Sequence, residues 1–180
     1  MTEPMLAWET DGNGLVRGAH RHVSPNQDER PAGAEVDLLV LHFISLPPGH
    51  FDGEAIHRLF TNTLDESVHP DLAGLSTLRV SAHFLIRRDG SLHQYVPCDR
   101  RAWHAGQSSW RGRNRCNDFS LGIELEGCET QPFTEDQYAT LAHLVPLLKS
   151  RYPIVDVVGH EHIAPGRKID PGPTFDWRRI

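Results

Sequence analysis

One stretch of the chain, Val36–Ile44, restricts the fold more than any other. It is nearly continuous in apolar residues, rich in branched side chains, and followed by the turn-forming segment Ser45–Gly49. A run of this length and composition predicts a strand that is buried on both faces, as the strands of parallel sheets are. Such a strand needs covering elements on both sides, which predicts an α/β domain with a central sheet.

Two further segments predict strands of that sheet. Ser81–Pro97 consists of two strand-like runs around Asp89-Gly90, a dipeptide typical of tight hairpins. Phe119–Glu126 alternates strictly, so its four apolar residues should face a core while Ser120, Gly122, Glu124 and Glu126 face the other way. Together with the first strand, these segments predict a mixed central sheet.

Two helices are predicted to flank the sheet. Apolar residues recur at helical spacing within Gly53–Thr63, which indicates a short amphipathic helix. Thr134 and Gln137 match a capping box, and an apolar face follows at helical spacing to about Arg151. At 180 residues with 38% hydrophobic content, the chain suits one domain with a real core.

Composition excludes several classes of function. The formal charge of −6 leaves no basic surface for nucleic acid or an anionic membrane. No apolar run is long enough to span a membrane, and no export signal is recognisable, so we expect a soluble, cytoplasmic protein. Cys98, Cys116 and Cys128 are odd in number and irregular in spacing, which fits a reducing compartment. Residues 1–34 show no lasting period and predict an extended arm packed on the domain, with a short strand around Leu15–Val16.

A polar segment, Gly159–Gly172, carries the strongest functional signal. Its Gly and Pro residues predict a shaped loop rather than a helix or strand. The loop holds His160, His162 and Asp170, and it is either a solvated turn or part of a metal site. His42, near the end of the first strand, is either a core histidine or a third ligand.

Two imidazoles and a carboxylate form a three-ligand zinc set that keeps its fourth position open for catalysis. Amide hydrolysis at such a site also needs a base and a positive group near the developing oxyanion. Glu124 and Lys168 are candidates for these roles. Glu126 lies on the same face of the strand, where it either faces water or is a structural partner or a partner of a metal ligand, for example by holding a ligand imidazole.

Residues elsewhere are candidates for contacting a ligand. His83 either faces a cleft or caps a strand, and Trp103 either stacks on a sugar or fills the core. The arginines of the Gln107–Asp118 loop, including Arg115, either face solvent or recognise an anionic or sugar-rich ligand.

Five segments, taken in order, resemble the zinc N-acetylmuramoyl-L-alanine amidases. They are His42 at its strand end, the hairpin that begins Ser81-Ala-His83, Trp103–Gly106, Asn117–Gly127 and Gly159–Gly172. The resemblance covers roughly residues 36–177. It implies a zinc amidase catalytic domain over residues 35–180, with the single-domain fold that these amidases share with peptidoglycan-recognition proteins.

The resemblance also implies specific residue roles. One zinc ion per chain would be bound by His42, His160 and Asp170, the first histidine of the loop being favoured over His162. Glu124 would be the general base and Lys168 would stabilise the tetrahedral intermediate. The substrate cleft would contain Arg79, His83, Trp103 and Arg115. One departure is Phe43, since related recycling amidases tend to carry asparagine beside the first ligand.

The implied reaction is hydrolysis of the amide between (1,6-anhydro-)N-acetylmuramic acid and L-alanine of the stem peptide, in peptidoglycan recycling. The partner would be a muropeptide, and the protein would act as a monomer. Two alternatives are an amidase acting on intact peptidoglycan, such as an autolysin or endolysin, and a muropeptide-binding protein without activity. The complete ligand set favours an enzyme.

Overall fold

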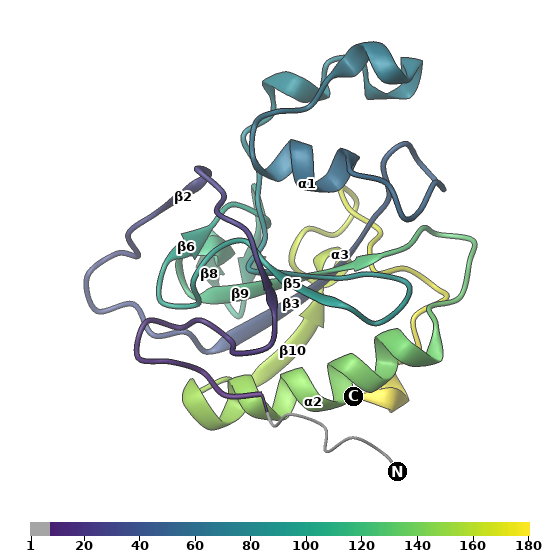
Figure 1. Cartoon of the computed structure of the whole chain (residues 1–180). Helices are drawn as coiled ribbons and strands as arrows, with labels where there is room; N and C mark the ends of the chain where they lie inside the picture. The colour runs from purple at the N-terminus through teal and green to yellow at the C-terminus, as the bar shows by residue number, and fades with distance from the viewer. Residues whose placement is uncertain (1–7) are drawn as a thin grey trace.

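The structure of the protein is a computed structural model that describes residues 8–180. A six-stranded sheet forms its centre (Figure 1). Its strands are His20–Arg21 (β1), Leu38–Ile44 (β3), Phe84–Ile86 (β4), Leu92–Gln94 (β5), Ser120–Glu126 (β9) and Asp156–Gly159 (β10). Their spatial order is β1-β5-β4-β9-β3-β10.

Smaller elements surround the sheet. Two short ribbons pair Gln27–Asp28 (β2) with Arg101–Ala102 (β6), and Ser109–Trp110 (β7) with Arg113–Asn114 (β8). The α-helices are Ala55–Phe60 (α1), Glu135–Arg151 (α2) and His160–Ile163 (α3). Single 3₁₀ turns lie at Glu66–Val68, Pro70–Leu72, Leu75–Thr77, Cys116–Asp118 and Trp177–Arg179.

The predicted mixed sheet and its hairpin are confirmed. Strand β3 pairs in parallel with both β9 and β10, and β4 pairs in parallel with β9 but antiparallel with β5 across the Asp89-Gly90 turn. The strand predicted around Leu15–Val16 is wrong, because Val16 makes only an isolated bridge to Thr10. Within the described part of the predicted arm, which begins at residue 8, it is β1 that joins the sheet, by pairing with β5.

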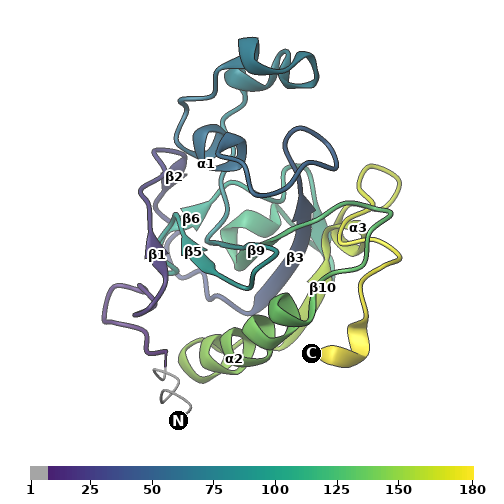
Figure 2. The same cartoon turned by 45° about the vertical axis from the view of Figure 1, so that its right-hand side comes forward.

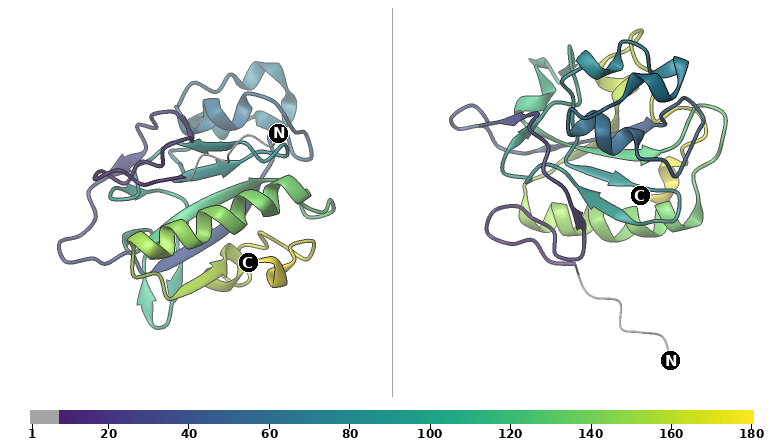
Figure 3. Two further views of the ribbon diagram at one scale, coloured as in Figure 1. Left: turned by 60° about the horizontal axis from the view of Figure 1, so that its bottom comes forward. Right: turned by 45° about the horizontal axis from the view of Figure 1, so that its top comes forward.

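Helix α2 covers one face of the sheet (Figure 3). Its predicted capping box is present, since Thr134 Oγ1 accepts from the Gln137 amide and Gln137 Oε1 accepts from the Thr134 amide. Apolar side chains of the helix pack against alternate residues of three strands. The strand residues are Leu39, Leu41, Phe84, Ile86, Leu121, Ile123 and Leu125.

The opposite face of the sheet is covered by two separate clusters. Helix α1 packs against Leu85 at one end, and Ile163 of α3 packs with Leu38 and Val40 at the other. Figure 2 shows the two helices apart from each other, α1 above the sheet and α3 beside β10. The side chains of His42 and Glu124 belong to this face by strand alternation and lie between the two clusters. No helix within residues 8–180 has the length and apolar character to cross a membrane. All three cysteines are free thiols.

Candidate metal centre

Parallel pairing brings the first two polar groups of the site together. His42 and Glu124 are direct partners in the register of β3 and β9, near the carboxyl ends of both strands. Strand β10 runs parallel to β3 on the other side, with Gly159 opposite Leu41. His160 follows Gly159 immediately, so it reaches the same edge of the sheet. Ligands commonly bind at this edge in α/β proteins, because polar side chains there leave the apolar core.

The sequence predicts a loop over the whole segment after β10, and this prediction is wrong for part of it. Its first four residues form the single helical turn α3. The Gly159 amide donates to His162 Nδ1 at 2.8 Å, which caps the turn, and Pro165-Gly166 follow its end. A Cβ at residue 159 would lie 2.6 Å from the Pro171 ring, so glycine lets the returning chain pack closely here.

This helical turn separates the two histidines of the segment. Residues two apart in an α-helix point about 200° apart around its axis, so His160 and His162 face opposite sides. His160 is buried and faces His42, whereas His162 is exposed and packs beside Trp177. Asp170 returns to the same place, held by a hydrogen bond from the Glu161 amide to its carbonyl.

Three donor atoms converge at the centre of the site. His42 Nδ1 and His160 Nδ1 are 3.0 Å apart, and they lie 2.9 and 3.1 Å from Asp170 Oδ2. His160 Nε2 donates to the Ala105 carbonyl, which leaves its Nδ1 lone pair directed at the other two atoms. Such convergence of two imidazole nitrogens and one carboxylate oxygen suits a metal ion. Among residues 8–180, no other set of three such donors lies this close together.

The protonation of these ligands favours metal binding. Burial lowers the pKa of His42 to about 4, although its hydrogen bond to Asp170 works against this. Burial works to raise the pKa of Asp170, but its close contacts with the imidazoles of His160 and His42 outweigh it and hold that pKa below its usual range. At neutral pH the site therefore offers a neutral imidazole at His42 and a carboxylate at Asp170, the forms in which these side chains bind metals.

Glu124 stands beside the three donors without being one of them. Its side chain lines the same cavity, and its Oε2 atom is buried with no hydrogen-bond partner among the described residues. Burial, followed by the charge of Asp170, raises the pKa of Glu124 well above the usual value for a carboxyl group. A buried carboxyl oxygen without a partner costs stability, which makes Glu124 a candidate for a chemical role.

The cavity that contains these groups has a volume of about 430 Å³. Its polar floor is formed by His42, Glu124, His160 and Asp170, and Lys168 stands at its exposed side. The remaining wall is largely apolar, and Phe43 belongs to it beside the first ligand. The other lining residues are Ile44, Phe60, Leu78, Val80, Ser81, Trp103, His104, Arg167 and Ile169.

The residues predicted to contact a substrate lie at different distances from this cavity. Trp103 lines it, while its indole nitrogen donates to Asp28. Arg79 is exposed between two lining residues, Leu78 and Val80. Arg115 is also exposed and lines an adjoining hollow that shares Trp103 with the main cavity.

His83 does not line either space, which corrects the expectation that it contacts a ligand. It is fully buried, accepts a hydrogen bond from the Gly122 amide at Nδ1, and donates from Nε2 to the Arg100 carbonyl. Burial, with a smaller effect of the nearby Arg30 charge, lowers its pKa to about 3. Strand alternation could predict the face of this side chain but not how deeply the face is covered.

Glu126 is likewise not a partner of a ligand imidazole. Its Oε1 accepts from the Asp52 amide and from Arg87 Nη1 at 3.1 Å, and its Oε2 accepts from the Arg88 amide. It therefore ties the end of β9 to the turn between β4 and β5. The sequence pattern placed it on the correct face but could not show which charged residue would meet it.

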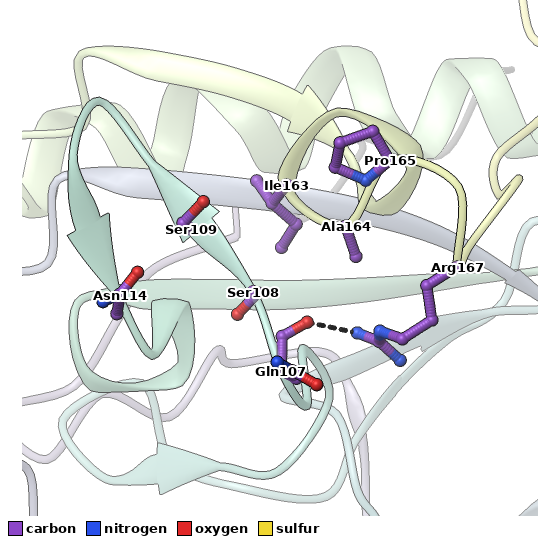
Figure 4. A pocket seen from close by; sticks show the side chains of 8 residues that line it. All are labelled: Gln107, Ser108, Ser109, Asn114, Ile163, Ala164, Pro165 and Arg167. Atoms are coloured by element: carbon purple, nitrogen blue, oxygen red, sulfur yellow. Dashed lines mark hydrogen bonds between the residues drawn. The ribbon is translucent and has the colours of Figure 1, made fainter.

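Two residues of the site were missed by the sequence analysis. His104 lies beside His42, and Arg167 donates to the carbonyls of Ala105 and Gln107. Arg167 also separates the main cavity from a second hollow, which Figure 4 shows from close by. His104 directly follows Trp103 in the Trp103–Gly106 segment, and a histidine in a segment that resembles the amidases was the available signal.

Comparison with known proteins identifies the family. The family model for N-acetylmuramoyl-L-alanine amidase matches residues 32–173. The chain is 56% identical over 169 residues to a Citrobacter freundii protein named 1,6-anhydro-N-acetylmuramyl-L-alanine amidase AmpD, with 93% of this chain and 90% of the relative covered.

Solved structures agree with this match. A crystal structure of a selenomethionine AmpD derivative superposes with a TM-score of 0.92 at 55% identity, covering 94% of this chain and 96% of that one. The Escherichia coli amidase AmiD, in complex with anhydro-N-acetylmuramic acid-L-Ala-D-gamma-Glu-L-Lys, gives a TM-score of 0.60 at 30% identity, covering 96% and 64%. The chain therefore belongs to the N-acetylmuramoyl-L-alanine amidase family.

Proposed function

We propose that this protein is a zinc-dependent hydrolase of the amide bond between 1,6-anhydro-N-acetylmuramic acid and L-alanine of the stem peptide. The observation that carries the proposal is the unpartnered Glu124 carboxylate next to three converging metal donors in one cavity. The names of the most similar relatives, and the muropeptide bound to AmiD, support this choice of substrate. In this proposal residues 35–180 form the catalytic domain, and residues 1–34 form the arm.

Zinc fits the donor set better than magnesium or calcium, because those ions prefer sites made of oxygen ligands. His42, His160 and Asp170 would hold one zinc ion per chain and leave a fourth position open. When bound, zinc lowers the pKa of a water molecule to roughly 7 and polarises a carbonyl group. No cysteine belongs to the donor set, so a closed structural site is not indicated.

Glu124 would act as the proton carrier of the reaction. Burial raises its pKa well above that of an ordinary carboxyl group, which makes it a stronger base than an exposed glutamate. It takes a proton from the attacking water and delivers it to the leaving nitrogen of L-alanine as the carbon–nitrogen bond breaks. Its unpartnered Oε2 is free to accept that proton.

Lys168 would stabilise the negative charge that develops on the carbonyl oxygen. It lines the cavity two residues before Asp170, and its exposed side chain brings a positive charge to the open side of the cavity. Trp103 offers an apolar face for the sugar at the same cavity. Arg79 and Arg115, which lie beside the cavity, would bind polar groups of the muropeptide.

Product analysis separates this function from its alternatives. Purified protein would be incubated with anhydromuropeptides and, separately, with intact sacculi, each with and without a chelator. We expect mass spectrometry to show free stem peptide only from the anhydro compounds and only in the presence of metal. Efficient release from sacculi would identify an enzyme of the intact wall, and binding without any release would identify a recognition protein.

The proposed setting is recycling of wall fragments in the cytoplasm by a monomeric enzyme. The anhydro substrate is a soluble fragment, so neither a membrane nor nucleic acid is required as a partner. Size-exclusion chromatography with light scattering would test the monomer, and cell fractionation would test the location.

A further inference from the structure

A chain of side-chain contacts leads from the candidate metal centre into the sheet. His42 Nε2 lies 2.9 Å from His104 Nδ1, and His104 Nε2 lies 3.2 Å from Ser120 Oγ. All three side chains are buried. His42 is therefore in contact with the other metal donors through one ring nitrogen and with His104 through the other.

The contacts have only one arrangement of protons that is compatible with a bound metal. His42 Nδ1 faces His160 and Asp170, so it must offer a lone pair when a metal is bound. The proton of the neutral His42 ring is then on Nε2 and is donated to His104 Nδ1. His104 in turn carries its proton on Nε2, where Ser120 Oγ accepts it.

Strand β9 has a space shaped for this ring. A Cβ at residue 122 would lie 2.5 Å from Cγ of His104, a separation that no real side chain tolerates. Gly122 therefore allows the imidazole to lie directly on the backbone of β9. The polar face of that strand thus has a glycine where His104 packs and a carboxylate, Glu124, one pleat further along.

The backbone around His104 is fixed independently. Asn117 Oδ1 accepts hydrogen bonds from the amides of His104 and Ala105, at 3.1 and 2.8 Å. The Ala105 carbonyl then accepts from His160 Nε2 at 3.0 Å. The adjacent residues His104 and Ala105 therefore each contact one ligand imidazole at the nitrogen that faces away from the metal donors. His104 contacts His42 with its side chain, and Ala105 contacts His160 with its carbonyl group.

We propose that His104 is a positioning residue of the metal centre: it accepts the Nε2 proton of His42 and so sets the tautomer and ring orientation of that ligand. The inference rests on the proposed function, because it assumes that His42, His160 and Asp170 hold zinc. Partners of this kind typically change metal affinity by about 10–100-fold when they are removed. His104 contacts no reacting atom in this role.

Two variants of similar size separate the hydrogen bond from the packing. His104→Asn keeps an acceptor, Oδ1, at the place of Nδ1, whereas His104→Leu fills similar space without one. Zinc affinity would be measured by competition with a chromophoric chelator. We expect His104→Leu to bind zinc about 10–100-fold more weakly than the unaltered protein, and His104→Asn to recover most of that loss. The inference would be overturned if His104→Leu bound zinc as tightly as the unaltered protein, or if both variants lost the same amount of zinc affinity.

A third variant tests the same role without altering His104. Gly122→Ala should displace the ring and weaken zinc binding, whereas Ser120→Ala, one contact further away, should have a smaller effect.

Imidazole nitrogen NMR of the zinc-loaded unaltered protein should show the Nε2–H tautomer for His42, and an Nδ1–H tautomer would contradict the proposal. If the unaltered protein binds no zinc, the proposed metal site itself fails. If it binds zinc and none of these variants differs from it, only the role of His104 fails.

Discussion

At the scale of single residues, Glu124 offers the clearest separation of chemistry from metal binding. Glu124→Gln keeps the shape of the side chain but removes its ability to take a proton. We expect kcat to fall by about 10²–10⁴-fold, because general acid–base catalysis contributes that much. Zinc content should stay at one per chain, since Glu124 is not among the converging donors. Turnover near normal with the metal retained would remove Glu124 from the mechanism.

His83 predicts a pH dependence of stability. Its folded pKa of about 3 lies below the ordinary value of 6.5, so the unfolded chain takes up this proton first as the pH falls. The stability that neutral His83 contributes is complete above about pH 6.5 and is lost progressively toward pH 3. One such proton corresponds to about 1.4 kcal/mol per pH unit between these limits.

His83→Asn isolates this effect, because asparagine does not titrate yet can still accept from the Gly122 amide. Urea unfolding of both proteins at several pH values, with a chelator present throughout, would give the two slopes. The unaltered protein should lose stability more steeply with acid than the variant. Parallel curves would show that His83 does not carry the buried, neutral imidazole described above.

At the scale of elements, Glu126 connects β9 to the turn between β4 and β5. Glu126→Ala would leave Arg87 without its partner in a pair whose side chains are 1% and 11% exposed. Removing one partner of a buried ion pair typically costs about 3–5 kcal/mol. We therefore expect a large drop in the free energy of unfolding by urea, with normal zinc content in the protein that remains folded.

Glu135→Ala is the matched control for this prediction. Glu135 also pairs with an arginine, Arg179, but its side chain is 82% exposed, so its loss should change stability little. If Glu126→Ala lost zinc without losing stability, Glu126 would hold a ligand imidazole after all, contrary to the contacts in the structure.

The elements show how far local patterns predict this fold. The hairpin around Asp89-Gly90 and the capping box of Thr134 and Gln137 were predictable, because both depend on residues close in the chain. Strand β1 was missed because its two residues become a strand only through pairing with β5. Helix α3 was missed because its single turn is stabilised by a histidine cap and by close packing at Gly159.

The same distinction holds for the site. His42, His160 and Asp170 could be selected because their residue types and the family resemblance agree, and the structure brings the three together. How deeply a side chain is buried, and which distant residue it contacts, could not be predicted in this way. The deep placement of His83 and the contact between His42 and His104 both depend on segments far apart in the sequence.

At the scale of the whole molecule, zinc binding should be coupled to folding. The three donors come from β3, α3 and the segment after it, so they are brought together only in the folded chain. A ligand that binds only the folded state, present at a thousand times its dissociation constant, stabilises that state by about 4 kcal/mol. Zinc should raise the melting temperature, and a chelator should reverse the change.

Asp170→Ala should abolish that coupling, because two imidazoles alone hold zinc poorly. Calorimetry of both proteins, with zinc and with chelator, provides the comparison. An equal rise in melting temperature for Asp170→Ala would place the stabilising zinc at a different location.

We propose that the amidase activity of this chain depends on one zinc ion held by His42, His160 and Asp170. The most direct measurement is zinc content by elemental analysis together with turnover of anhydromuropeptide, on the same preparations of the unaltered protein, His160→Ala and His162→Ala. These histidines lie two residues apart in one helical turn, but only His160 faces the other donors. We expect one zinc and full turnover for the unaltered protein, nearly the same for a folded His162→Ala, and neither for His160→Ala. Full zinc content in His160→Ala, or its loss only in His162→Ala, would contradict it.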